Sequence, residues 1–194
     1  MHGDMKLLLR AFLAGLTICL IILGLFFLAS VITSLLGLPA KLNLPEFVKL
    51  IGAAIFIGGL GLALWLFRYR SPVTMIVSTY YTFGKMFTGS PVSKSGGRKE
   101  ALVVKGPQKF VRHPLYLGAA TMFLGWALFT DSTSSLLAVL FVLIWFISVQ
   151  IPFEERELHA LFGDQYARYS EEVPMLIPFS KSKRKSHSSH PKTN

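Results

Sequence analysis

Arg112 and His113 stand directly before Pro114 in the stretch FVRHPLYLGAATMFLGWALF. Proline is favoured at the first position of a helix and keeps the residue before it out of the helical region. A helix is therefore expected to begin at Pro114, with His113 as its N-cap. The unpaired N–H groups at the start of this helix, with the Arg112 guanidinium beside them, would form an anion-binding pocket. An arginine that simply extends to lipid headgroups explains the motif alone equally well.

Glu154 and Glu155 follow directly after the apolar run SSLLAVLFVLIWFISVQIPF. The short connector TDSTSS predicts an antiparallel hairpin, so Arg112 and His113 should lie opposite the two carboxylates. Carboxylates beside a membrane are costly and often mark function, although an ion pair that closes the hairpin is the simpler interpretation. Glu155 or His113 could act as a general base, and Arg112 supplies a fixed positive charge beside them. The candidate catalytic residues are therefore Arg112, His113 and Glu155.

Other catalytic patterns receive little support from the sequence. His113, Glu155 and His159 lack the H-E-x-x-H spacing, and a single cysteine, Cys19, excludes a cysteine framework, so no metal site is predicted. The chain contains no G-x-S-x-G nucleophile motif. The glycines of IGGLGLALW lie inside an apolar run, which indicates helix packing rather than dinucleotide binding.

The elements that would position the polar residues are apolar runs of bilayer length. Of the 194 residues, 52% are hydrophobic and 15% are charged, and the mean hydropathy is +0.52. A bilayer core of about 30 Å needs about 20 apolar residues in a helix. We therefore expect an all-α, polytopic membrane bundle with four transmembrane helices, at about 7–37, 45–67, 114–130 and 135–150.

Two further segments are expected to be helical or membrane-associated. Residues 71–88 fit a short fifth span, a re-entrant segment or an interfacial helix, and their two tyrosines suit an interface. After the last span, the helix should continue as PFEERELHALFG, kinked by Pro152 and stopped by Gly163. A final cytosolic helix, capped by Asp164 and ended by Pro174, should follow.

Basic residues set the expected orientation and the class of partner. The net charge of +10 comes from residues beside the apolar runs and in the tail, which favours anionic lipid headgroups over nucleic acid. The connector TDSTSS has no lysine or arginine, whereas 94–112 is basic, so the polar clusters should face the cytoplasm. Three regions are expected: a transmembrane hairpin (1–70), a core with the functional site (71–180) and a disordered basic tail (181–194).

The two polar clusters together resemble a known pattern. GPQKFVRHPLYLG followed by EERELHALFGDQYARYSEEVPMLIP is similar to the isoprenylcysteine carboxyl methyltransferases and phospholipid methyltransferases, which are integral-membrane enzymes. Their signature is Arg-His-Pro-x-Tyr, a hydrophobic stretch, Glu-Glu, then Phe-Gly-x-x-Tyr-x-x-Tyr and Val-Pro. Every element is present in order, over about 102–178, so 71–180 would be the methyltransferase core.

The resemblance implies methyl transfer from S-adenosyl-L-methionine to a lipid or prenylated acceptor, with carboxyl methylation of an isoprenylcysteine-like substrate favoured. Phospholipid amine N-methylation, a sterol-reductase-like NADPH enzyme and a non-enzymatic membrane protein are the alternatives. Gln150 occupies the position at which the isoprenylcysteine enzymes often have a substrate-contacting arginine, a departure that bears on whether a carboxylate is the substrate. The cofactor-binding residues that the resemblance implies are Glu100, Ala101, Leu102, Val103, Gln108, His113, Pro114, Leu115, Tyr116 and Glu154.

The chemistry of the residues agrees with this cofactor. Its carboxylate suits Arg112 and the helix start, and its ammonium and ribose hydroxyls suit Glu154 or Glu155. The partners implied are the lipid or prenylated substrate and membrane lipids, with no nucleic acid. The aromatic side chains that could pack on adenine are Tyr116, Tyr166 and Phe110.

Overall fold

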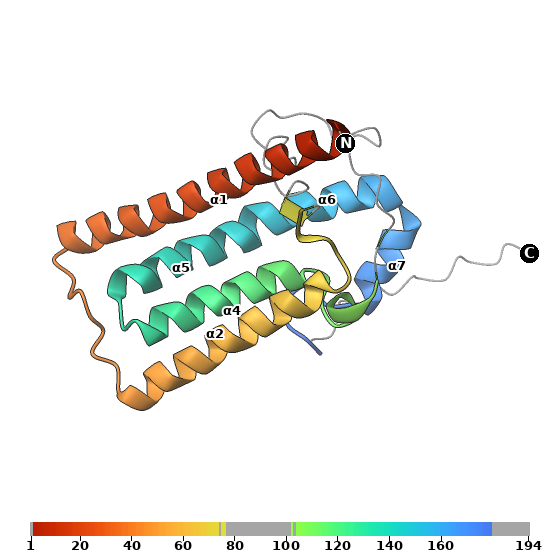
Figure 1. Ribbon diagram of the computed structural model, residues 1–194. Helices are drawn as coiled ribbons and strands as arrows, with labels where there is room; N and C mark the ends of the chain where they lie inside the picture. Colours follow the sequence, from red (N-terminus) through yellow and green to blue (C-terminus); the bar gives the residue numbers. More distant parts are fainter. Residues whose placement is uncertain (1, 74, 77–101, 103, 180–194) are drawn as a thin grey trace, which may run out of the picture.

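The protein is a bundle of long helices. The computed structural model describes residues 2–73, 75–76, 102 and 104–179. Most of the segment 71–88, the residues Glu100, Ala101 and Val103, and the tail 181–194 lie outside the described residues. In chain order the elements are α1 (His2–Leu35), α2 (Glu46–Phe67), the 3₁₀ turn η1 (Gly106–Lys109), α4 (Pro114–Phe129), α5 (Thr133–Trp145), the π-helical segment η2 (Phe146–Gln150), α6 (Ile151–Phe162) and α7 (Asp164–Glu172) (Figure 1). The described part is helical without a β-strand, which confirms the predicted all-α class.

The helices pack as two neighbouring pairs joined by the α4–α5 hairpin. α4 packs most extensively against α2, and α1 packs against α5. The α2–α4 contact depends on glycine: a Cβ at Gly59 would lie 2.8 Å from the carbonyl oxygen of Gly118, and one at Gly125 would overlap the backbone of Phe56. Small residues allow helix backbones to approach closely in membranes. This confirms the packing role predicted for the glycines of IGGLGLALW at one of them, Gly59.

Three helices are long and apolar enough to cross a bilayer: Phe12–Leu35, Glu46–Phe67 and Thr133–Phe162, the last formed by α5, η2 and α6. α4 is apolar but has 16 residues, which is about 24 Å at 1.5 Å per residue, against a bilayer core of about 30 Å. The four predicted spans therefore correspond to three full-length candidates and one shorter helix. α4 is short because proline begins it and the turn at Asp131, with a φ of 54°, ends it.

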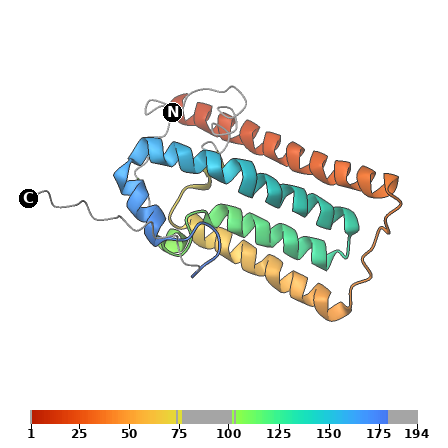
Figure 2. The same ribbon diagram turned by 180° about the vertical axis from the view of Figure 1, so that it is seen from behind.

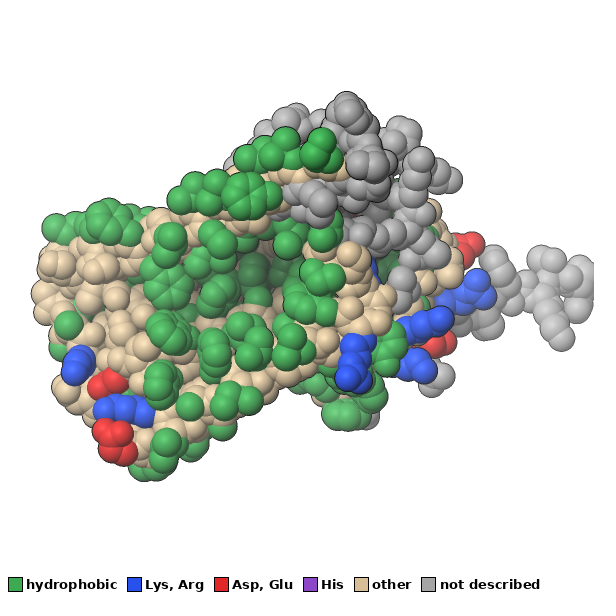
Figure 3. Space-filling view, in the orientation of Figure 1, with side chains coloured by type: hydrophobic (Ala, Val, Ile, Leu, Met, Phe, Trp, Pro, Cys, Tyr) green, Lys and Arg blue, Asp and Glu red, His purple; other side chains and the backbone are tan. Residues whose placement is uncertain are grey.

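The surface between the two ends of the bundle is apolar. Figure 3 shows hydrophobic side chains along the middle of the face in view, with lysine, arginine, aspartate and glutamate gathered toward its two ends. Exposed large apolar residues lie on α1, α2 and α5, and include Leu20, Phe27, Leu50, Ile57 and Ile144. An apolar belt between charged ends is the surface that a protein presents to lipid tails and headgroups.

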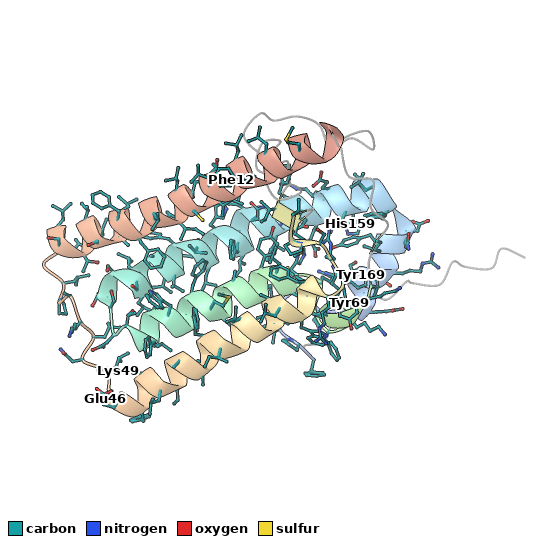
Figure 4. All side chains as sticks on the ribbon, viewed as in Figure 1. Phe12, Glu46, Lys49, Tyr69, His159 and Tyr169 are labelled. Carbon is teal, nitrogen blue, oxygen red and sulfur yellow. The ribbon has the colours of Figure 1, made fainter. Side chains whose placement is uncertain are left out.

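At the end of the bundle distant from the start of α4, the α4–α5 turn is tied to the α1–α2 linker. The Asp131 carbonyl oxygen accepts the Leu42 N–H at 3.1 Å, and its carboxylate accepts the Leu44 N–H at 3.0 Å. Lys49 Nζ lies 3.8 Å from the second Asp131 carboxylate oxygen; Figure 4 shows Lys49 at this end, beside Glu46. These contacts hold the two helical pairs together at one end.

The third full-length helix changes character where the polar residues begin. Its first turn is capped by Ser132, whose hydroxyl oxygen accepts the Ser135 N–H at 3.2 Å. Near the predicted kink at Pro152 the helix contains the π-helical η2, which ends two residues before Pro152, where proline lacks an N–H and its ring crowds the carbonyl four residues earlier. The predicted stop at Gly163 is confirmed, with a φ of 52°. Asp164 is the first residue of α7; its predicted N-cap position belongs to Gly163.

Candidate active site

The start of α4 has the predicted form. Pro114 is the first helical residue, and His113 is the N-cap, with extended φ and the carbonyl oxygen that accepts the Leu117 N–H at 3.1 Å. The His113 side chain does not cap the helix. It is 3% exposed and turns toward α6, because proline at the next position fixes the backbone and leaves the imidazole free to make contacts across the hairpin.

The predicted meeting of the two polar clusters is confirmed. One oxygen of the Glu155 carboxylate, Oε1, lies 2.8 Å from Arg112 Nε and 3.0 Å from His113 Nε2. The Tyr166 hydroxyl donates a hydrogen bond to the same oxygen at 3.1 Å. On the other side of the imidazole, Glu154 Oε2 lies 3.6 Å from His113 Nδ1. The imidazole is therefore held between two carboxylates.

The Arg112 guanidinium also binds the last turn of α7 and the residue that follows it. Its Nη1 donates to the carbonyl oxygens of Ser170 and Val173, the latter at 3.3 Å. The backbone N–H groups of Arg112 and His113 donate to the carbonyl oxygens of Pro174 and Met175 at 2.9 and 3.2 Å. In Figure 2, α6 continues the line of α5, and α7 turns back across the end of the bundle, toward the start of α4. The sequence analysis does not predict this pairing, although the extended conformation required before Pro174 is a signal for it.

The turn η1 forms another side of the site. Gly106 has a φ of 57°, and a Cβ there would overlap the Tyr69 ring, so this turn sits directly against the end of α2. The Tyr169 hydroxyl donates to the Gln108 carbonyl oxygen at 2.7 Å, and Figure 4 shows Tyr69 and Tyr169 at the same end of the bundle. Burial raises the pKa of Tyr169 to about 12, so its hydroxyl stays a neutral donor.

Aromatic rings line the site on the side of the apolar hairpin. The Tyr116 ring lies 5.7 Å from the His113 ring and 5.0 Å from the Phe146 ring, between centroids. Gln150, the last residue of η2, is 1% exposed, and neither its Oε1 nor its Nε2 has a hydrogen-bond partner among the described residues. The family resemblance places Gln150 near this site, but the sequence does not indicate that its amide is unpaired.

The two carboxylates determine the protonation of His113. Burial of the imidazole is the largest single effect and disfavours its charged form. The interactions with Glu154 and Glu155 together outweigh burial, so the pKa of His113 is raised above its usual value. The cluster therefore favours an imidazolium that is hydrogen-bonded to Glu155 through Nε2 and faces the Glu154 carboxylate with Nδ1.

The raised pKa of His113 predicts a stability that depends on pH. The folded protein keeps this proton at pH values at which the unfolded chain has lost it, so folding is favoured at low pH. The stabilisation should be complete below the ordinary histidine pKa of about 6.5 and decline as pH rises through the raised value. Thermal unfolding in detergent across this range measures the effect. His113→Gln should remove the decline, whereas His159→Gln, the same change at an exposed histidine, should retain it; a decline that survives in His113→Gln would contradict the assignment.

Most of the residues that the sequence singled out come together. Arg112, His113, Pro114, Tyr116, Glu154 and Glu155 lie in one cluster. Leu102 packs on Tyr166, Tyr169 and Val173 beside it, and the buried Gln108 Oε1 has no partner among the described residues. Leu115 is half-buried on the first turn of α4.

Of the further aromatic contacts expected for adenine, that of Tyr166 differs in the structure, and that of Phe110, which is 45% exposed, stays a prediction. Tyr166 is fully buried between α6 and α7, with its ring 4.8 Å from that of His159, and it positions Glu155 instead of presenting an open face for adenine. Phe110 packs against Trp65, with centroids 6.0 Å apart. Among the described residues, no three histidine, cysteine or acidic side chains are grouped so as to hold a metal ion. His159 contacts Tyr166 rather than His113.

The fold and the site define a class. The protein is a helical bundle with an apolar surface of bilayer length, and a buried cluster of arginine, histidine and two glutamates lies where one hairpin ends. This is a membrane protein with a polar site at one end of its apolar helices. The chain belongs to the phospholipid methyltransferase family, whose sequence model matches residues 48–165. The match includes α2 and so extends the similarity beyond the predicted 102–178.

Individual relatives include two kinds of methyltransferase. Protein-S-isoprenylcysteine O-methyltransferase B of Arabidopsis thaliana is 30% identical over 143 residues, which cover 68% of this chain and 69% of the relative. Methanethiol S-methyltransferase 1 of Bradyrhizobium diazoefficiens is 46% identical over 74 residues, 38% of this chain. The chain spans 25% of the length of that second relative. A methanethiol S-methyltransferase of Mycobacterium tuberculosis is 32% identical over 127 residues, 60% of this chain and 49% of the relative.

Proposed function

We propose that the protein transfers a methyl group from S-adenosyl-L-methionine to a lipophilic acceptor, such as a lipid or a prenylated molecule, at the cytoplasmic edge of the membrane. The observation that carries this proposal is the Arg112–His113–Glu154–Glu155 cluster, placed where an apolar hairpin meets the bilayer edge. Family membership supplies the reaction class, and the cluster supplies a place for a charged, water-soluble donor beside a lipid-soluble acceptor.

The residues of the cluster fit the proposed methyl donor. Its ammonium group matches the Glu154 carboxylate, and the unpartnered Oε1 of Gln108 offers an acceptor for an amino or hydroxyl group. The donor supplies a methyl group on a positively charged sulfur. The chain's own part is to hold it at the start of α4, through His113, Pro114, Leu115 and Tyr116. The upstream residues Glu100, Ala101, Leu102 and Val103 complete the proposed binding set.

Arg112 and Glu155 have a positioning role in this proposal. Each is already paired with protein groups: Arg112 donates to two backbone carbonyls, and Glu155 is hydrogen-bonded to His113 and Tyr166 and forms an ion pair with Arg112. The pair joins α4, α6 and the chain after α7 into one wall. Rigid walls raise rates by aligning the reacting groups and excluding water.

The test is binding followed by transfer. Isothermal titration of the purified full chain with S-adenosylhomocysteine, in detergent or lipid nanodiscs, should give saturable binding. Labelled methyl groups should then pass from S-adenosylmethionine to at least one acceptor in a panel containing a prenylcysteine, a long-chain thiol and phosphatidylethanolamine. The proposal would be refuted by a preparation that unfolds cooperatively but neither binds S-adenosylhomocysteine nor transfers labelled methyl groups to any acceptor.

A further inference from the structure

The strap, defined as residues 173–179, follows α7 and runs beside the start of α4. The Arg112 N–H donates to the Pro174 carbonyl oxygen at 2.9 Å, and the Arg112 guanidinium donates to the Val173 carbonyl oxygen at 3.3 Å. The His113 N–H donates to the Met175 carbonyl oxygen at 3.2 Å. The positions of Arg112 and His113, two residues of the candidate site, therefore depend on the strap.

The far end of the strap is apolar and exposed. Ile177 is 70% exposed and Phe179 is 90% exposed. The Phe179 ring meets the Phe110 ring edge-on, with centroids 6.5 Å apart, and Phe110 packs in turn on Trp65 in the last turn of α2. Because α2 is long and apolar enough to cross a bilayer, its last turn lies where lipid tails meet headgroups. The exposed end of the strap lies at the same depth.

Basic side chains border this apolar end. Arg68 follows α2 directly, Lys105 precedes η1 and Lys109 ends it. The two elements meet where a Cβ at Gly106 would overlap the Tyr69 ring. All three basic side chains are exposed, and Figure 3 shows lysine and arginine side chains beside hydrophobic ones at this end of the bundle. Arg68, Lys105, Lys109, Ile177 and Phe179 are called the docking patch below.

The charge of the docking patch specifies its partner. The end of α2 and the segment around η1, FRYR and KGPQKFVR, contain five basic residues and no acidic one. Glu171 and Glu172, the acidic residues closest to the strap in the chain, belong to α7. Exposed apolar side chains bordered by lysine and arginine fit a bilayer interface that contains anionic phospholipid. A neutral interface would cover the apolar side chains but leave the basic ones without counterions.

We propose that the docking patch binds anionic phospholipid headgroups of the surrounding bilayer, and that this contact keeps the strap closed on Arg112 and His113 and so strengthens binding of the methyl donor. The effect on donor binding rests on the proposed function, whereas the lipid contact does not.

The strap couples the lipid contact to the site because the docking patch is divided between two parts of the chain. Its basic residues belong to α2 and η1, and its apolar residues belong to the strap. The patch is complete only while Phe179 lies against Phe110. A ligand that binds the closed form alone makes local opening rarer. Anionic lipid at the patch therefore protects the hydrogen bonds between the strap and the start of α4.

Hydrogen exchange tests the lipid contact without any other ligand. The full chain is placed, one copy per disc, in nanodiscs of phosphatidylcholine alone or with about 30% phosphatidylglycerol, which supplies the anionic headgroups. Exchange of the Arg112 and His113 amides, which donate to the strap, should be about fivefold slower in the anionic discs, the effect of about one basic residue near an anionic surface.

Variants of the docking patch should lose this difference between the two lipids. Phe179→Ala should bring the ratio of exchange rates close to one, because the patch can no longer be completed, and Lys105→Gln should lower it. Phe47→Ala and Lys41→Gln are the matched controls, since they make the same changes at exposed positions at the opposite end of the bundle. Both controls should keep the ratio of the wild type.

Isothermal titration in the same discs tests the effect on the donor site. The affinity for S-adenosylhomocysteine should be about fivefold higher in the anionic discs, in proportion to the slower exchange. Phe179→Ala should bind it equally well in both lipids, with the affinity that the wild type has in phosphatidylcholine.

Several results would overturn the inference. Equal exchange rates in the two lipids, or a lipid effect that persists in Phe179→Ala, would contradict the lipid contact. Protection that appears only in discs with two copies, whatever the lipid, would assign the patch to a second copy of the chain. Slower exchange with an unchanged affinity for S-adenosylhomocysteine would overturn the coupling to the donor site. Absence of S-adenosylhomocysteine binding in both lipids would instead refute the proposed function, while slower exchange in the anionic discs would still establish the lipid contact.

Discussion

Glu155→Gln should lower the free energy of unfolding by about 3 kcal/mol, because it breaks a largely buried ion pair and leaves the cation in place. The Arg112 and His113 side chains are 11% and 3% exposed, and both lie within 3.0 Å of Glu155 Oε1. A neutral amide cannot compensate the guanidinium charge. It also weakens the hydrogen bond from Tyr166, which joins α7 to α6.

Thermal or denaturant unfolding in detergent measures this loss. For a chain of this size, about 3 kcal/mol corresponds to a fall of about 6–12 °C in Tm. Glu171→Gln is the matched control, because it makes the same chemical change at an exposed position of α7, where surface substitutions usually cost little. If the two variants unfold at the same temperature, Glu155 does not hold the wall of the site together.

Glu154→Gln should have its main effect on ligand binding. In the proposed function, the Glu154 carboxylate pairs with the ammonium group of the methyl donor, and a hydrogen bond between charged groups contributes about 1.5–3 kcal/mol. The affinity for S-adenosylhomocysteine, measured by isothermal titration, should therefore fall about 10- to 100-fold. The stability loss should be smaller than for Glu155→Gln, since Glu154 lies 3.6 Å from the imidazole against 3.0 Å for Glu155.

The two glutamate variants thus separate the two roles. Glu155→Gln should be the less stable protein, and Glu154→Gln should be the weaker binder at a temperature where both are folded. An unchanged affinity in Glu154→Gln would show that the donor's ammonium group binds elsewhere, and Glu171→Gln serves again as the control.

The sequence predicts the parts of this site that depend on local rules. Proline sets the first residue of α4, and a short connector without room for another element makes α4 and α5 antiparallel. These two facts bring His113 and Glu155 to the same depth, although 42 residues separate them. The glycine stop before α7 is equally local, because few other residues adopt a positive φ.

Other contacts of the site depend on tertiary packing and could not be predicted in this way. Arg112 binds carbonyl groups of Ser170 and Val173, 58 and 61 residues further along the chain, and backbone carbonyls leave no mark in a sequence. The π-helical turn that positions Gln150 depends on how the helix accommodates Pro152 against its neighbours. The role of Tyr166 was misread because a tyrosine near a proposed nucleotide site fits stacking as well as hydrogen bonding.

The Asp131 contacts have a mechanical consequence for access to the buried Gln150. The α4–α5 turn is anchored to Leu42 and Leu44. A change in the angle between the two helices of the hairpin therefore rotates them about this turn. A tilt of about 5° between them displaces their opposite ends, which the contacts of Arg112 and His113 with Glu155 join, by about 2 Å over the length of α4 at 1.5 Å per residue. The same tilt hardly moves the anchored end, so the hairpin parts most where the amide lies and least where its helices are joined.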